Sequence, residues 1–235
     1  MRDGSLEPGG IPQWRIPTSE DATERFSWGG LGIATNLWLP RLPSGSGRPD
    51  LHVVWRLGKR PALPVATERL SVRGKDGEAA FTVAGDDRVK VFDIERVAAY
   101  VIKSKPRVIE IFPAAPEDPM EVERFLVNTA LPTFAGIVEG LVCLHASAVA
   151  LNGKATVFAG PSRVGKSTSA WRLLNEGWRL IGDDAVVLRE DSGTWMVPPG
   201  SRGIRLDALK RGGVWRSGPK VETIVPAAEG PSRLG

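Results

Sequence analysis

One eight-residue run limits most strongly what this chain can fold into: Gly160-Pro161-Ser162-Arg163-Val164-Gly165-Lys166-Ser167. It matches the pattern G-x-x-x-x-G-K-[ST], with an apolar strand-like segment before it (154–159) and a helix-like segment after it (166–176). Glycines let the backbone turn so that successive N–H groups point inward, and a helix N-terminus adds partial positive charge. The run therefore predicts a phosphate-binding loop. The alternative, a glycine-rich turn without a ligand, does not explain the Lys-Ser pair.

Within this loop, two side chains have separate chemical tasks. Lys166 offers a full positive charge to the outer phosphates of a nucleotide, and Ser167 offers a hydroxyl to Mg²⁺. We therefore expect ATP and Mg²⁺ to bind, and phosphate transfer to follow.

Two adjacent carboxylates, Asp183 and Asp184, follow the next strand-like segment, 178–182. In a strand–loop–helix–strand unit both strands end on the same side of the sheet, so this pair is expected near the phosphates. One carboxylate can help to hold Mg²⁺ and the other can accept a proton from an attacking hydroxyl. A solvated turn is the alternative, because Asp is common in turns.

His145 is the third candidate, and its predicted position depends on a hairpin. Asn152-Gly153 predicts a two-residue turn that pairs Leu151 with Lys154, and counting back pairs His145 with Gly160. His145 would then lie at the rim of the nucleotide site, beside Asp183 or a phosphate. A strand histidine bonded to a carbonyl is the alternative, and a bulge or register slip would break the inference.

The rest of the chain divides by composition into three parts. Residues 1–50, rich in Gly, Pro and Ser, predict an irregular and partly mobile segment. Residues 51–117 read as an antiparallel β-rich region, with a hairpin around Lys75-Asp76-Gly77. Residues 118–235 contain the loop, and a helix is expected to open at Asp118-Pro119, kink at Pro132 and stop at Gly140. The predicted fold class is mixed α/β, or α+β.

Charge and hydropathy exclude several classes of function. The balance of 31 basic and 27 acidic residues, +4 overall, does not by itself indicate nucleic-acid binding. No apolar run approaches the ~20 residues of a membrane span, and residues 1–16 lack a signal-peptide core, so we expect a cytoplasmic protein without membrane partners. The single Cys143 lies in an apolar run and predicts a buried thiol. The basic stretch 210–220 would dock an acidic acceptor, supply an arginine to the transferring phosphate, or form a solvated loop.

Four segments together resemble the catalytic domain of HPr kinase/phosphorylase: Leu144-His145-Ala146-Ser147-Ala148-Val149, Asn152-Gly153-Lys154, the phosphate loop, and 177–184. The resemblance is specific over about residues 141–188. It implies a P-loop kinase core of the phosphoenolpyruvate carboxykinase-like type, and ATP- and Mg²⁺-dependent phosphorylation of a serine hydroxyl. It also implies that Ser167 and Asp183 contact the metal, that His145 and Lys166 support catalysis, and that Asp184 accepts the proton, although the two aspartates can exchange roles. The implied nucleotide-binding residues are Gly160, Pro161, Ser162, Arg163, Val164, Gly165, Lys166, Ser167 and Thr168.

The chain departs from the resembled family in three places. The downstream Glu-x-Arg-Gly run is absent, with only Ser201-Arg202-Gly203-Ile204-Arg205 near its place. Thr168 stands where the HPr-specific enzymes usually carry an acid, and the chain ends at Gly235, before the family's C-terminal helical part. Phosphorylase activity, recognition of HPr, completeness of the chain and assembly into homo-oligomers are therefore left open.

Three functions remain open on the sequence. The first is a kinase acting on the hydroxyl of a peptide, small protein or metabolite, and the second is a nucleotide-binding regulatory module without transfer. The third, a small-molecule kinase of the nucleotide-kinase fold, predicts an all-parallel core sheet around the loop. The Asn152-Gly153 hairpin feeding directly into the loop argues against it.

Overall fold

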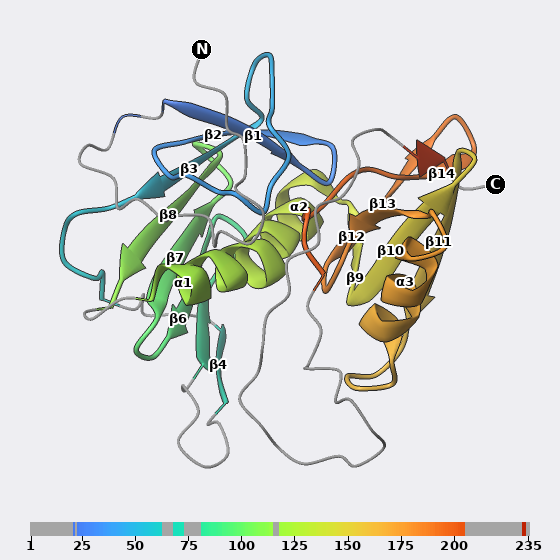
Figure 1. The fold of residues 1–235 in the computed structure, drawn as a ribbon. Helices are drawn as coiled ribbons and strands as arrows, with labels where there is room; N and C mark the ends of the chain where they lie inside the picture. Colours follow the sequence, from blue (N-terminus) through green and yellow to red (C-terminus); the bar gives the residue numbers. More distant parts are fainter. Residues whose placement is uncertain are drawn as a thin grey trace.

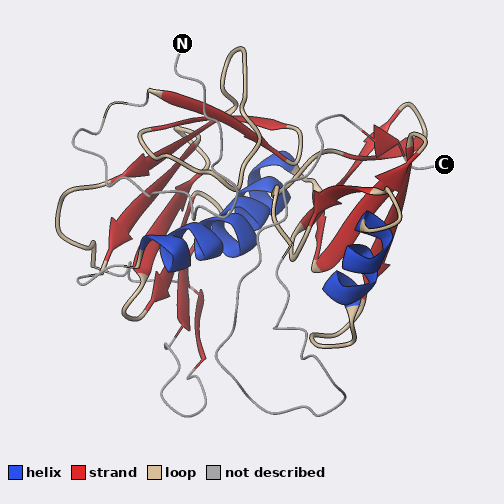
Figure 2. Cartoon of the chain, in the orientation of Figure 1, coloured by secondary structure: helices blue, strands red, loops and turns tan. Residues whose placement is uncertain are grey.

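The computed structural model describes residues 21, 23–62, 68–72, 81–114, 118–204 and 232–233, and these form a mixed α+β structure with two β-sheets. Figure 1 shows the larger sheet on the left and the smaller sheet on the right, with a long helical segment lying against the larger one. Figure 2 shows that strands predominate over helices in both parts.

The larger sheet has, among the described residues, eight strands in the order β1-β2-β3-β8-β7-β6-β5-β4. Their bounds are β1 Glu24–Trp28, β2 Leu31–Thr35, β3 Leu51–Trp55, β4 Glu68–Val72, β5 Phe81–Gly85, β6 Val89–Ile94, β7 Ala98–Lys103 and β8 Val108–Pro113. The antiparallel hairpin around Lys75-Asp76-Gly77 is confirmed by the pairing of β4 with β5, although its turn lies outside the described residues.

Two features of this sheet correct the expectation. Strands β1 and β2 lie within residues 1–50, so that part is not irregular over Glu24–Thr35. The sheet is also mixed rather than antiparallel, because β3 runs parallel to both β2 and β8. Long connections precede and follow β3, and only such connections allow neighbouring strands to run in the same direction. The boundaries proposed between the three parts of the chain stay predictions.

The helical segment that covers the larger sheet comprises α1 (Pro119–Phe125), a wider π-helical turn η1 (Leu126–Ala130) and α2 (Leu131–Glu139). It begins as predicted, because the Asp118 side chain accepts a hydrogen bond from the Met120 N–H. It ends at Gly140, which has a left-handed conformation. The break expected at Pro132 takes the form of the π turn just before it. Buried Tyr100 connects sheet and helix through a 2.7 Å hydrogen bond to the Val122 carbonyl.

The smaller sheet carries the predicted phosphate loop. Among the described residues its strand order is β12-β10-β11-β15-β14-β13-β9. The bounds are β9 Val142–Leu144, β10 Ala146–Leu151, β11 Lys154–Ala159, β12 Arg179–Gly182, β13 Val186–Asp191, β14 Thr194–Val197 and β15 Ser232–Arg233, with helix α3 at Lys166–Leu174. The Asn152-Gly153 turn is confirmed, since Leu151 pairs with Lys154.

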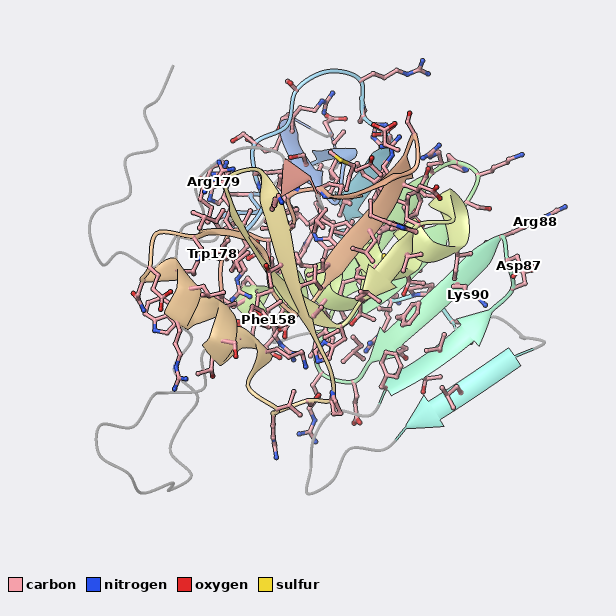
Figure 3. All side chains as sticks on the ribbon, turned by 90° about the vertical axis from the view of Figure 1, so that its right-hand side faces the viewer. Asp87, Arg88, Lys90, Phe158, Trp178 and Arg179 are labelled. Carbon is pink, nitrogen blue, oxygen red and sulfur yellow. The ribbon has the colours of Figure 1, made fainter. Side chains whose placement is uncertain are left out.

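Helix α3 packs on one face of the smaller sheet through an apolar cluster. Val149, Ala170 and Leu180 form its buried centre, and Phe158 and Trp178 pack against them. Figure 3 shows these last two side chains on the side of α3, far from the β5–β6 turn with Asp87 and Arg88. The other face of the sheet has an alanine- and valine-rich core of its own.

The two sheets share a continuous interior, because Ala185 and Val187 from the smaller sheet belong to the same buried cluster as the larger sheet and its helix. Gly29, in the turn between β1 and β2, approaches closely: a Cβ atom there would lie 2.5 Å from Val187 Cγ2. Its N–H also donates to the Pro199 carbonyl at 2.8 Å.

Glu110 and Cys143 are among the titratable groups whose pKa values are shifted in the fold. Burial alone raises the pKa of the Glu110 carboxyl, but hydrogen bonds and charges from Lys103 and Arg56 outweigh burial, and the net pKa is lowered. The Cys143 thiol, expected to be buried, is half-buried, and this partial burial raises its pKa to about 11. In the described part of the chain, no helix has the length and apolar character needed to cross a membrane.

Candidate functional site

The loop of residues 160–165 connects the end of β11 to the start of α3, as the sequence predicts. Gly165 occupies the N-cap position with a left-handed φ of +98°, which a residue with a side chain rarely adopts. No side chain caps the helix, so its first N–H groups are not occupied by a capping group and are available to an anion. Residues 160–164 are exposed.

Lys166 is the first residue of α3, and it is buried although its side chain carries a charge. Its ammonium group donates to the carbonyl oxygens of Gly160 and Pro161, each at 2.9 Å. The side chain thus folds back over the loop and lies on the inner side of the turn. A phosphate bound by the loop would meet this charge directly.

Ser167 and Asp183 lie together, as predicted for a metal-binding pair. The Ser167 hydroxyl donates to Asp183 Oδ1 at 2.9 Å, and Asp183 is only 3% exposed. A third residue, buried Ser147 on β10, also donates to Asp183 Oδ1 and lies 3.4 Å from the Ser167 hydroxyl oxygen. Three side-chain oxygens therefore converge beside the helix N-terminus.

Sheet topology explains why these residues meet. Strand β10 lies between β11 and β12 and is antiparallel to both, so β11 and β12 run in the same direction. The phosphate loop follows the end of β11, and Asp183 follows the end of β12. Both therefore lie at the edge where β10 begins, which brings Ser147 to the same place.

The turn after β12 separates the two aspartates. Asp184 has a left-handed backbone with φ of +65°, and the Ala185 N–H donates to the Asp183 carbonyl at 2.8 Å. The Asp184 carboxylate is directed to Asn128 of the π turn, whose side-chain amide donates to Oδ2 at 3.1 Å. The Asp183 carboxylate thus accepts a hydrogen bond from the loop residue Ser167, whereas the Asp184 carboxylate contacts the helix that covers the larger sheet.

The strand pairing of His145 differs from the prediction. The expected strand 141–150 is interrupted at this residue, because β9 pairs with β13 while β10 pairs with β11 and β12. The β10–β11 ladder ends at Ala146 and Ala159, one pair short of the expected His145–Gly160 pair. The His145 Nδ1 atom lies 3.0 Å from the Asp184 carbonyl oxygen. The alternative, a histidine bonded to a carbonyl, is therefore what the structure contains.

The other predicted residues are distributed along the loop. Pro161, Ser162, Arg163 and Val164 are exposed in it, and half-buried Thr168 follows Ser167 on α3. Stretch 210–220 lies outside the described residues.

Sequence reasoning missed three residues beside the aspartates. Ser147 had a usable signal, since a hydroxyl inside an apolar strand needs a hydrogen-bond partner when buried. Ser201 contacts the backbone of Asp183, with its hydroxyl 3.4 Å from both the N and the O of that residue. Asn128 is 56 positions from Asp184 and had no local signal.

The donor set fits a magnesium ion. The side chains of Ser167 and Asp183 offer hard oxygen ligands, which Mg²⁺ prefers. In the part of the chain that the structure describes, no group of three or more His, Cys, Asp or Glu residues forms a complete metal site.

Comparison with known proteins gives distant matches only. HPr kinase/phosphorylases from two Clostridium botulinum strains are 45% identical over 51 residues, 22% of this chain and 17% of theirs. HPr kinase/phosphorylases from Listeria welshimeri and Listeria innocua are 28% identical over 186 residues, 74% of this chain. The match spans 58% of the Listeria proteins, little more than half their length. No family model matches, and no solved structure matches significantly. The chain is thus distantly similar to HPr kinase/phosphorylases, and this similarity indicates a kinase-like function.

Proposed function

We propose that this protein is an ATP-dependent kinase that transfers the γ-phosphate to a serine or similar hydroxyl of a protein, peptide or small molecule. The observation that carries the proposal is the convergence of Lys166, Ser167 and Asp183 beside the N-terminus of α3. A cation, a hydroxyl and a carboxylate at this place are what a triphosphate with its metal requires. The distant similarity to HPr kinase/phosphorylases supports the same chemistry.

Each residue then has a defined task. The loop N–H groups and the start of α3 bind the phosphates, and the Lys166 ammonium neutralises charge on the outer ones. Ser167 and Asp183 would hold Mg²⁺, which would supply positive charge to the β- and γ-phosphates. Asp183 suits this task better than Asp184, because its carboxylate accepts a hydrogen bond from the Ser167 hydroxyl and so lies beside it.

Asp184 is the proposed proton acceptor. The acceptor hydroxyl oxygen attacks the γ-phosphorus, the bond from that phosphorus to the bridging oxygen breaks, and ADP leaves. The hydroxyl proton passes to the Asp184 carboxylate. His145 contributes through the Asp184 backbone, because its ring nitrogen contacts that carbonyl.

Phosphate transfer from γ-labelled ATP tests the proposal. The acceptors are purified HPr, which the names of the relatives suggest, and a serine-centred peptide library. Label should enter serine in a Mg²⁺-dependent reaction, and Asp184→Asn should reduce kcat by about 100-fold or more. Transfer by Asp184→Asn at the wild-type rate would exclude Asp184 as the base, and no label in any acceptor would contradict kinase function.

A nucleotide-binding regulatory module is the second candidate. The absence of the Glu-x-Arg-Gly run favours it, since the departure affects a part of the resembled family's pattern outside the phosphate loop. This module would bind Mg²⁺-ATP without turnover against any acceptor. The third candidate, a nucleotide-kinase fold, does not fit a sheet in which β10 runs antiparallel to both neighbours.

A further inference from the structure

The helix over the larger sheet contacts the proposed active site through Asn128. Its side-chain amide donates to Asp184 Oδ2 at 3.1 Å, although the two residues are 56 positions apart. Asn128 lies in the π turn η1 and is half-buried, whereas its neighbours Leu126 and Val127 are buried in the large core. This contact therefore joins the helix over the larger sheet to the turn after β12.

The π turn has an identifiable cause. Proline has no N–H, and its ring collides with the carbonyl four residues earlier in a regular helix. For Pro132 that carbonyl belongs to Asn128. The helix widens there, and the Leu131 N–H bonds to the Leu126 carbonyl, five residues back. Single π turns inside α-helices occur frequently at functional sites.

The backbone contacts of the turn at Asp184 do not involve its carboxylate. The residue has a left-handed backbone that is uncommon for aspartate, and its carbonyl oxygen is already engaged with His145. The amide of Asn128 donates to the Asp184 carboxylate, whereas the Ser167 hydroxyl donates to Asp183. A hydrogen bond to an ionised acceptor is stronger than a neutral one, so the contact can select one side-chain orientation.

We propose that Asn128 is a positioning residue, which holds the Asp184 carboxylate in the orientation needed to accept the proton of the acceptor hydroxyl. This inference rests on the proposed kinase function. It adds that the proton acceptor is oriented by the helix covering the larger sheet. Asn128 itself touches neither nucleotide nor acceptor.

Two substitutions separate orientation from packing. Asn128→Ala removes the amide and leaves space, whereas Asn128→Asp keeps the shape but replaces the donor by a like charge. If Asn128 positions Asp184, both variants lose kcat by on the order of 10-fold to 100-fold, and Asn128→Asp loses at least as much as Asn128→Ala. If Asn128 only fills space, Asn128→Asp retains more activity than Asn128→Ala, and the proposal is wrong.

The assay is transfer of label from γ-labelled ATP to HPr and to the serine-centred peptide library, with melting temperatures measured in parallel. The dissociation constant of Mg²⁺-bound non-hydrolysable ATP should stay within twofold of wild type, because the hydrogen bonds of Lys166 to the loop and of Ser167 to Asp183 do not involve Asn128. Thr129→Ala, in the same π turn, is the matched control and should retain wild-type kcat. Wild-type transfer with unchanged kcat in both Asn128 variants overturns this inference alone, whereas no transfer by the wild type overturns it together with the proposed function.

Discussion

Replacing Lys166 by methionine tests the phosphate loop most directly. The methionine side chain has nearly the same length and is apolar, so it fits a buried position and removes only the charge and its donors. In the described structure the ammonium donates to two loop carbonyls, those of Gly160 and Pro161, at 2.9 Å each. A bound phosphate has to compete with these carbonyls for the same donors.

The expected loss follows from this competition. A phosphate charge about 4 Å from the ammonium gains about 4 kcal/mol at an effective dielectric constant of about 20. Giving up one or both carbonyl bonds costs about 1 kcal/mol each. The difference, about 2–3 kcal/mol, corresponds to binding weakened by roughly 30-fold to 150-fold. We therefore expect Lys166→Met to raise the dissociation constant of Mg²⁺-bound non-hydrolysable ATP by that factor.

Isothermal titration calorimetry measures this change, and Lys154→Met provides the matched control. Lys154 is exposed at the start of β11, at the opposite end of the strand from the loop, so its replacement removes the same charge at a distance. The control should bind within twofold of wild type. Equal binding by wild type and Lys166→Met would show that this ammonium does not meet a phosphate, and the interpretation of residues 160–167 would have to be abandoned.

Two substitutions and one reactivity measurement test the fold. Glu110→Gln should cost about 1–2 kcal/mol of unfolding free energy at pH 7. Folding lowers the pKa of Glu110 from its ordinary 4.5, so the extra stability of the wild type should be complete above pH 4.5 and be lost as pH falls through the pKa of the folded state. Equal losses of unfolding free energy in urea titrations at pH 7 and pH 3 would contradict this. The Cys143 thiol has a pKa of about 11 against an ordinary 9.0, so its thiolate fraction at pH 8 is about 100-fold lower in the folded protein. Because a thiolate of higher pKa is a better nucleophile, it should react with a disulfide reagent about 10-fold more slowly in the folded than in the urea-unfolded protein, and equal rates would contradict its half-buried position. Gly29→Ala should destabilise by about 2 kcal/mol or more, and by more than Gly153→Ala, since both have positive φ but only the first meets Val187; similar losses in thermal melts would exclude the close approach.

Local parts of the structure could be predicted from the sequence because each is determined by neighbouring residues. The Asp118-Pro119 cap, the Asn152-Gly153 turn and the stop at Gly140 depend on backbone preferences within a few positions, and each is present. The loop of residues 160–165 between a strand and a helix is present for the same reason. The joining of Ser167 with Asp183 could also be inferred, because strand direction alone brings both to one edge of the sheet.

Errors arose where the chain changes partners or where distant segments meet. His145 does not pair in the predicted hairpin, because β9, which ends just before it, pairs with β13 instead of β11. The parallel pairing of β3 depends on which strands become neighbours, which local propensity does not encode.

The sequence by itself determined that a strand, a glycine-rich turn and a helix with Lys166 and Ser167 at its start follow one another, since these depend on local backbone geometry. Only the tertiary structure decided the environment of the two aspartates: Ser147 beside Asp183, and Asn128 beside Asp184. The physical reason is that side-chain hydrogen bonds act over about 3 Å. Their partners are therefore selected by how sheets and helices pack, and not by separation along the chain.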